Sequence, residues 1–396
     1  MLEGLKIVEL ATYIAAPGAG GVMADWGAEV IKIEAPAGDP MRTFLGSVSD
    51  LADSPPFDQD NRGKRSIVLD IGKPHGREAA KKLALGADVF LTNVRPAALK
   101  RAGLDWDTLH AAAPKLIYCS LTGYGLVGPD ADKPGFDVAA FWSRTGVASL
   151  TAPKGTEPFP IRTGMGDHTA SLATVAAILA AVIERGRTGQ GRLVETSLIR
   201  AGAYAIGSDL AIQLRLGRIA STRARDQVPN PLANFFKTAD DAWLCILPKN
   251  GGADWPQIAK GVGRPELAHD PRFARGKERR THAVELVRAL DHAVGALTLA
   301  EITVSLDAAD VVWSPVQTPA QFVADAQAEA AGCFVDTPDG EGGSYRAPAS
   351  PARFPGADDG PKGPAPRLGE HTQEVLKGLG YAASEIDAVL AEAAPS

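Results

Sequence analysis

The stretch LKIVELATYIAAPGAGGVMADWGAEVIKIE, residues 5–34, decides the fold of this chain. Its two ends, residues 5–10 and 28–34, are runs rich in Val, Ile and Leu, which is typical of β-strands. The Ala- and Gly-rich residues 17–27 between them predict a turn and a helix. Strands that stay apolar along almost their whole length, joined through a helix, indicate parallel pairing in a sheet that is covered on both faces.

The same alternation of strand and helix continues through the first half of the chain. Apolar runs at residues 65–70, 87–93 and 115–121 predict further strands, and residues 74–85 predict one of the helices between them. We therefore expect an α/β fold whose large domain has a Rossmann-like, doubly wound parallel sheet. Residues 35–64 predict no regular element, and a loop of that length in a compact domain is usually functional or disordered.

The chain has 396 residues, which is too long for one ordinary hydrophobic core and indicates two domains. Residues 235–249, FFKTADDAWLCILPK, predict a β-hairpin that amphipathic helices follow, so a smaller α+β domain is expected in the middle of the chain. The predicted parts are a large domain of residues 1–215 with 335–396, a small domain of residues 225–320, and linkers at 216–224 and 321–334.

The composition argues against several classes of protein. Hydrophobic residues make up 45% and charged residues 22%, as in a globular protein, and the net charge of -6 argues against a nucleic-acid partner. The three cysteines fit neither a disulfide framework nor a metal-binding motif, so a cytoplasmic protein without a metal is expected. The most apolar stretch, residues 170–183, falls short of the roughly 20 residues that span a bilayer, so no membrane partner is expected.

Residues 17–21, PGAGG, follow the first predicted strand and imitate part of a dinucleotide-binding motif. In that motif the glycines let a pyrophosphate approach the N-terminus of a helix. Gly18 and Gly20 fit the pattern, but Met23 stands where the third glycine belongs. We therefore expect no nicotinamide cofactor, and we expect these glycines to let a helix pack close to the sheet.

Asp167 stands at the start of a long Ala-rich apolar run that predicts a helix. As the N-cap of that helix, its carboxylate would accept backbone N–H bonds, and these bonds and the helix dipole would favour its ionised form. A carboxylate nucleophile must also be ionised, and Gly164 and Gly166 would let a substrate approach it closely. The cap and the nucleophile are compatible roles. His168 is expected to be a surface or packing residue, because neighbours on a helix point in different directions.

Arg95, Lys100 and Arg101 come directly after the predicted strand at residues 87–93. Open α/β sheets bind ligands beyond the carboxyl ends of their strands, and arginine offers a planar, permanently charged fork for phosphate. These residues are therefore either phosphate ligands or the solvated start of a helix.

Several motifs follow one another along the chain: LEGLKIVEL (2–10), WGAEVIKIE (26–34), NRGKRSIVLDI (61–71), NVRPAALKRAGLDW (93–106), LTGYGLVGPDADKPGFD (121–137), GMGDHTAS (164–171), RTGQGRLVETSL (187–198) and LGEHTQEVL (368–376). Taken in this order, they resemble the motifs of the class III CoA-transferase family (CaiB/BaiF), typified by formyl-CoA:oxalate CoA-transferase. Each motif is loose, and their shared order makes the resemblance specific.

The resemblance implies a large α/β domain built from both chain ends, a small central domain and an interlocked homodimer. It implies acyl-CoA as substrate and Asp167 as the nucleophile, which would form a mixed anhydride and then an aspartyl-CoA thioester. The family also contains α-methylacyl-CoA racemases, in which a histidine of a GHD motif moves the α-proton. Phe136 stands at that position here and cannot carry a proton, so racemisation is the lesser alternative. A non-catalytic CoA-binding protein is disfavoured because Asp167 and its glycines are present.

The resemblance also implies individual contacts with coenzyme A. Asn93, Val94 and Arg101 match nucleotide-contacting positions, Arg95 is a further phosphate ligand, and Leu69 fits an adenine-side contact.

Other positions match the part of the family site that lies near the thioester. Tyr13 and Ala15 belong to a turn that lines the CoA channel, and Tyr124 matches an aromatic residue beside the thioester. Gly251 and Gly252 match a glycine loop that shields the intermediate, although an ordinary turn is the alternative. Ile14 stands where the oxalate-specific enzyme has glutamine, and Ala35 where an arginine often binds phosphate. Both departures weaken a formyl/oxalate assignment.

Overall fold

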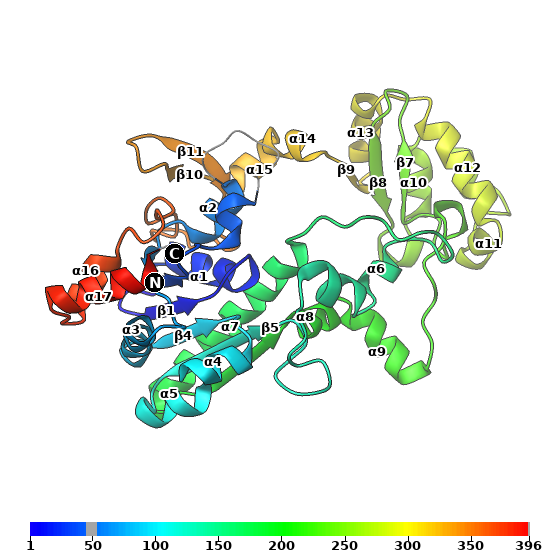
Figure 1. Ribbon diagram of the computed structural model, residues 1–396. Helices are drawn as coiled ribbons and strands as arrows, with labels where there is room; N and C mark the ends of the chain where they lie inside the picture. Colours follow the sequence, from blue (N-terminus) through cyan, green and yellow to red (C-terminus); the bar gives the residue numbers. More distant parts are fainter. Residues whose placement is uncertain (45–53, 395–396) are drawn as a thin grey trace. The chain divides into compact units, whose positions relative to one another are not determined.

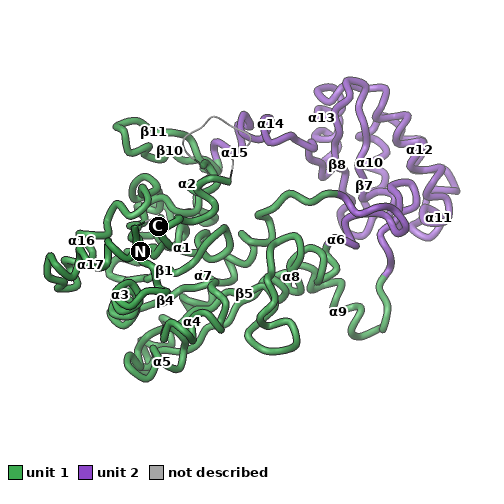
Figure 2. Tube along the Cα trace, viewed as in Figure 1, with its two compact units in different colours: residues 1–147, 160–219, 331–396 green, residues 148–159, 220–330 purple. Residues whose placement is uncertain are grey.

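The computed structural model describes residues 1–44 and 54–394. The chain divides into two compact units, which Figure 2 shows in different colours. Unit 1 comprises residues 1–147, 160–219 and 331–396, and unit 2 comprises residues 148–159 and 220–330. Residues 148–159, which were expected in the large domain, therefore belong to unit 2.

Unit 1 is built on a parallel sheet of six described strands (Figure 1). The strands are β1 (Lys6–Leu10), β2 (Glu29–Glu34), β3 (Arg65–Val68), β4 (Val89–Thr92), β5 (Ile117–Thr122) and β6 (Leu193–Ser197). Their order is β3-β2-β1-β4-β5-β6, so the chain winds outward from β1 on one side and from β4 on the other. The point where the direction reverses lies between β1 and β4, which is where such sheets bind ligands. The predicted doubly wound sheet is confirmed, although β6 was not predicted.

Helices cover both faces of this sheet. On one face, α1 (Ala15–Asp25) packs against α7 (Met165–Thr188) and against β1, β2 and β4. On the other face, a core that includes Val8, Phe90 and Leu376 is closed by helices from both chain ends. These helices are α3 (Pro74–Leu85), α4 (Pro96–Ala102), α5 (Trp106–Ala112), α16 (Thr372–Gly378) and α17 (Ala383–Ala393).

The helix α7 is longer than its apolar centre suggested. It spans 24 residues and is by length and composition alone able to cross a membrane, so the expectation that this stretch is too short does not hold for the helix. It packs against α1, β5 and β6 through buried residues such as Ala170, Thr174 and Ile178, as a core helix does. The segment after β6 forms two helices, α8 (Leu198–Ala205) and α9 (Gly207–Leu216), which meet at Ile206.

The glycines of α1 are packing residues, as the sequence indicated. A Cβ atom at Gly20 would lie 2.1 Å from Oε2 of Glu9, and one at Gly21 would lie 2.7 Å from the carbonyl oxygen of Asp60. Only a residue without a side chain lets α1 lie this close to β1 and to the segment that contains Asp60.

Two segments contain elements that were not predicted. Between β2 and β3 lie η1 (Pro40–Thr43) and α2 (Pro55–Asn61), while residues 45–53 fall outside the described part. In the Pro- and Gly-rich region near the C-terminus, β10 (Phe334–Pro338) and β11 (Ser344–Pro348) form an antiparallel hairpin. Arg62 joins these parts, because it donates to the carbonyl of Pro348 at 3.0 Å and pairs with Asp25 of α1 at 2.6 Å.

Unit 2 contains the predicted hairpin. β7 (Asn234–Lys237) and β8 (Trp243–Leu247) pair antiparallel, and β9 (Val312–Pro315) adds a third strand. Its core, which includes Phe236, Trp255 and Leu286, lies against α10 (Trp255–Gly261), α12 (Ala283–Val294) and α13 (Leu299–Ala308).

The remaining described helices of the two units are short. They are η2 (Asp137–Ser143), α6 (Val147–Leu150), η3 (Arg225–Gln227), η4 (Asn250–Gly252), η5 (Pro265–His269), α11 (Gly276–Thr281), α14 (Pro319–Val323) and α15 (Ala326–Ala330).

Candidate active site

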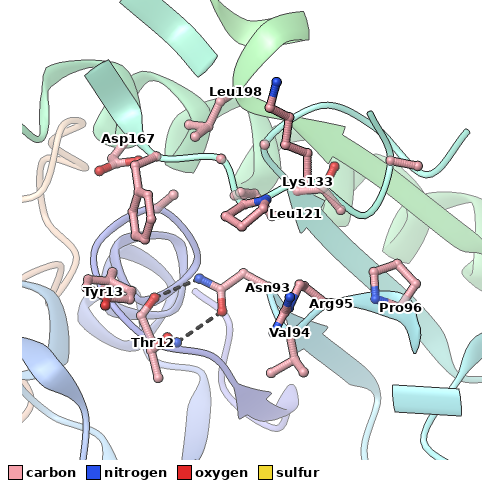
Figure 3. Close-up of a pocket in the computed structure, with 17 residues that line it drawn as sticks. Thr12, Tyr13, Asn93, Val94, Arg95, Pro96, Leu121, Lys133, Asp167 and Leu198 are labelled. Atoms are coloured by element: carbon pink, nitrogen blue, oxygen red, sulfur yellow. Dashed lines mark hydrogen bonds between the residues drawn. The ribbon is translucent and has the colours of Figure 1, made fainter. Parts of the chain in front are cut away.

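A cavity of about 410 Å³ opens in unit 1 at the carboxyl ends of β1, β4 and β5. It therefore lies at the point where the strand order reverses. Figure 3 shows the side chains around it. Six of the predicted site residues line it together: Tyr13, Ala15, Asn93, Val94, Arg95 and Asp167.

The turn after β1 is held by Asn93, which follows β4. The side-chain oxygen of Asn93 accepts the Thr12 N–H at 3.0 Å, and its amide nitrogen donates to the Thr12 carbonyl at 2.7 Å (Figure 3). Tyr13 next to it has a φ of 65° and donates its backbone N–H to Asp39 at 3.1 Å. Asn93, predicted as a nucleotide contact, thus positions the turn that lines the cavity.

A network of buried charges on the neighbouring segments fixes the same turn. Glu9 on β1 pairs with Lys32 at 3.1 Å and with Lys64 at 2.8 Å, and all three side chains are fully buried. Lys32 donates to the carbonyl of Ala11 at 2.9 Å, and Lys64 donates to that of Pro17 at 2.9 Å. Because an unpaired buried charge is costly, this network strongly favours one conformation of the backbone between β1 and α1.

Asp167 lies in the first turn of α7 and is not its N-cap. The cap residue is Gly164, whose φ of 111° suits only glycine, and its N–H is accepted by Asp137 at 2.7 Å. The prediction that Asp167 caps the helix was therefore wrong, because Asp137 from the start of η2 supplies the carboxylate. Asp167 is 7% exposed and faces the cavity.

The electrostatic surroundings of Asp167 disfavour its charge. Burial first of all, and then the negative charge of Asp137, raise its pKa to about 7 against the opposing effect of His168. Burial also raises the pKa of Asp137. The expectation that the helix start keeps Asp167 ionised was wrong, because loss of solvent and a second carboxylate outweigh the helix dipole.

His168 points away from this cavity. Its Nε2 lies 3.1 Å from Oδ1 of Asp60, and this hydrogen bond raises the pKa of the imidazole. The ring is largely exposed, as a surface residue would be, but it has a buried acidic partner that the sequence did not indicate.

Several predicted site residues lie outside the set that lines the cavity. Leu69 is 1% exposed within the core, so its side chain offers no surface to an adenine. Arg101 is exposed on α4, and the ring of Tyr124 lies 5.9 Å from the Lys133 ammonium. Ile14 is buried with Met41 and Phe57.

Gly251 and Gly252 belong to unit 2. Both have positive φ values, 68° and 92°, in the short helix η4. Arg279 donates to the carbonyl of Gly252 at 3.2 Å and fixes this end of the turn.

Sequence reasoning missed Lys133, Phe136 and Asp137 as parts of the site. Lys133 and Phe136 line the cavity, and Asp137 holds the start of α7. All three lie in DKPGFD after β5, where a charged residue, a Pro-Gly turn and an aromatic residue in succession were the available signal.

Residues 2–372 match CoA-transferase family III, and the chain belongs to this family. It is therefore a class III CoA-transferase, an enzyme that moves CoA between acyl-CoA thioesters and carboxylic acids.

The similarity to individual relatives runs over the whole length. The chain is 33% identical to (R)-2-hydroxy-4-methylpentanoate CoA-transferase of Clostridioides difficile, covering 98% of this chain and 97% of that one. It is 33% identical to cinnamoyl-CoA:phenyllactate CoA-transferase of Clostridium sporogenes, covering 98% and 95%. Among solved structures, a CaiB/BaiF family protein from Brucella suis superposes with a TM-score of 0.84 at 31% identity, covering 96% of this chain and 99% of that one.

Proposed function

We propose that the enzyme transfers CoA through a covalent intermediate on Asp167. The observation that carries the proposal is a carboxylate that lines the cavity in the first turn of α7. A carbonyl carbon that enters the cavity can reach this group, and a carboxylate is a competent nucleophile toward a thioester.

The sequence of steps balances without a further reactant. An oxygen of Asp167 attacks the thioester carbon of the donor, and the C–S bond breaks to give a mixed anhydride and the CoA thiolate. The thiolate attacks the aspartyl carbon, which releases the first acid and leaves an aspartyl-CoA thioester. The second acid attacks that carbon and expels the thiolate. This gives a second mixed anhydride. The thiolate then attacks its acyl carbon, which forms the new acyl-CoA and frees the Asp167 carboxylate.

The raised pKa of Asp167 favours the first step. Only the ionised form attacks, so part of the enzyme is inactive below pH 7. Once formed, however, that charge sits in a buried site beside Asp137, and formation of the anhydride moves it from the carboxylate to the sulfur of CoA. Relief of this unfavourable interaction lowers the barrier relative to an aspartate in water.

The cations of the cavity support a place for the phosphates of CoA. Arg95 follows β4 and Lys133 follows β5, and both line the cavity at the ends of parallel strands. Arginine binds phosphate through a planar fork, and lysine binds it as a point charge.

The acids in the names of four of the relatives fall into two kinds. Two relatives are named for 2-hydroxy-4-methylpentanoate and phenyllactate, which carry a branched alkyl or an aryl group and one carboxylate. Others are named for citramalate or glutarate with succinyl-CoA or succinate, which carry two carboxylates. The donor and acceptor of this enzyme belong to one of these kinds.

A homodimer is part of the proposal. Every residue of the fully described helix α9 is at least partly exposed, and Leu214 and Leu216 are largely so. A helix with exposed leucines supports an interface with a second copy. Sedimentation should give twice the mass of one chain, and a monomer at micromolar concentration would contradict this part.

The test of the proposed function is transfer itself. The enzyme is mixed with an acyl-CoA and a ¹³C-labelled acid, and label entering the acyl-CoA is followed. Asp167→Asn should lose transfer, whereas Asp107→Asn, an exposed aspartate in the first turn of α5, should keep it. Transfer by Asp167→Asn at the wild-type rate would contradict the proposal. Exchange of the α-proton without transfer would favour the racemase.

A further inference from the structure

We propose that Tyr13 and Phe136 bind the acyl group, and that the enzyme therefore uses monocarboxylic acids with an aryl or branched alkyl group and rejects dicarboxylic acids. The inference rests on the proposed function, because it takes the acyl group to sit against Asp167. It goes further in choosing one of the two kinds of acid from the cavity itself.

Tyr13 is held in a strained conformation that has no role in the core. Its φ of 65° lies in the left-handed region, which a bulky residue rarely adopts. Asp39 binds its backbone N–H, and Asn93 binds the residue before it through both backbone groups. Strain that the surroundings enforce this firmly is typical of a functional position. Its effect is to keep a tyrosine ring 40% exposed in the cavity.

Phe136 completes an aromatic pair with this ring. The two ring centres are 5.3 Å apart and the rings are nearly perpendicular, at 84°. Phe136 is 54% exposed and comes from the segment before η2, so two separate parts of the chain bring the rings together. Both line the same cavity as Asp167. Two half-exposed aromatic rings in one cavity offer an apolar surface that a substrate group can cover.

The cavity has a further apolar side chain beside the two rings, because Leu198 also lines it. Ile14 and Phe141 are buried next to the two glycines that precede Asp167: a Cβ atom at Gly164 would lie 3.6 Å from Cδ1 of Ile14, and one at Gly166 would lie 2.4 Å from the ring of Phe141.

The charges around Asp167 oppose a second carboxylate. The groups whose charges shift its pKa are Asp137, His168 and Asp60, of which two are acids and the histidine bonds to Asp60. Within the described cavity lining the cations are Arg95 and Lys133, which the proposed function assigns to the phosphates of CoA. Figure 3 shows Arg95 on the opposite side of the view from Asp167 and Tyr13, and Lys133 beside Leu198. A distal carboxylate at the acyl end would thus meet the two aromatic rings in the cavity and the negative charge of acids buried nearby, which rejects dicarboxylic acids.

The test compares donors of similar length on the wild-type enzyme. The rate at which each acyl-CoA forms a hydroxylamine-sensitive adduct on Asp167 is measured for 4-methylpentanoyl-CoA, 3-phenylpropionyl-CoA, succinyl-CoA and glutaryl-CoA. We expect the first two to react at least about tenfold faster, since a pocket of matched polarity discriminates by such factors or more.

Variants test the two rings. Tyr13→Gly removes one ring and relieves the positive φ, and Phe136→Ala removes the other. Each should reduce the rate with 3-phenylpropionyl-CoA about tenfold or more and leave the slow rate with succinyl-CoA nearly unchanged. Tyr13→Phe keeps the ring and should retain the preference. Tyr204→Ala, which changes a tyrosine that is 89% exposed and outside the cavity lining, is the control for loss of a ring.

The outcomes separate this inference from the proposed function. Adducts that form as fast from succinyl-CoA as from 3-phenylpropionyl-CoA overturn the inference and leave the covalent mechanism intact. An equal loss with every donor in both ring variants also overturns it, because the rings would then act on structure. No adduct from any donor overturns the proposed function first.

Discussion

Replacement of Asp167 by asparagine should stabilise the protein, and the gain should grow with pH. The pKa of Asp167 is about 7 in the folded chain against 3.8 for an ordinary aspartate. The folded state therefore holds the proton more tightly than the unfolded state does. The favourable contribution of the protonated group is complete below about pH 4 and is lost as the pH rises through 7.

The size of the effect follows from these two values. The raised pKa lowers the free energy of unfolding by about 4 kcal/mol at pH 8, where the folded carboxylate is charged, and by about 1.6 kcal/mol at pH 5, where folding protonates a group that is ionised in the unfolded chain; these values take 1.36 kcal/mol for each tenfold change in proton affinity. Asp167→Asn carries no such charge. Its advantage over wild type should thus widen by about 2.5 kcal/mol between pH 5 and pH 8.

Urea unfolding of both proteins at several pH values measures this difference. Asp107→Asn, at an exposed position in the first turn of a helix, controls for the loss of a helix-terminal charge and should run parallel to wild type. Parallel curves for Asp167→Asn and wild type from pH 5 to pH 8 would refute the reasoning, because Asp167 would then have an ordinary pKa.

Three further outcomes follow from the same geometry. In single-turnover experiments the rate of adduct formation should rise with pH and level off above about 7. Asp137→Asn should move the midpoint of this profile to lower pH, because it removes a charge that raises the pKa of Asp167. An unmoved midpoint would contradict this. Asn93→Ala should raise KM for acyl-CoA about tenfold with a smaller change in kcat, because it removes the two hydrogen bonds that hold the turn at Thr12. An unchanged KM would show that these hydrogen bonds do not position the turn for binding. Gly20→Ala should lower the free energy of unfolding by about 1–3 kcal/mol or more, because its Cβ would lie 2.1 Å from Glu9. Gly207→Ala in α9 is the control, because a Cβ there meets nothing within 4 Å. Equal melting temperatures for the two variants would exclude the packing role of Gly20.

The sequence allowed the sheet to be predicted where each strand carries its own signal. β1, β2, β4 and β5 each contain several aliphatic or aromatic residues, because both faces of a parallel sheet are buried. β1 and β2 also carry charged residues, among them the buried Glu9 and Lys32. The helix α2 was missed because it spans seven residues, begins with two prolines and has a buried side that includes Phe57 and Asn61. Only contacts with distant segments stabilise an element this short.

The candidate site was predictable in position and not in its electrostatics. Tyr13, Asn93 and Asp167 were predicted from motifs, and the fold brings them to one cavity. The pKa of Asp167 depends on its burial and on Asp137, which is remote along the chain and adjacent only after folding. The local sequence pattern predicts where a helix lies and which residues could cap it. Burial of a carboxylate and the approach of a second one depend on tertiary structure.

The most direct test of the central claim is mass spectrometry of the enzyme incubated with an acyl-CoA and then treated with hydroxylamine. A thioester or anhydride on Asp167 becomes a hydroxamate, which adds a defined mass to the peptide that contains this residue. The account predicts this mass on wild type and its loss in Asp167→Asn. Transfer of CoA by the wild-type enzyme with no modification of Asp167, or with modification of another residue, would contradict it.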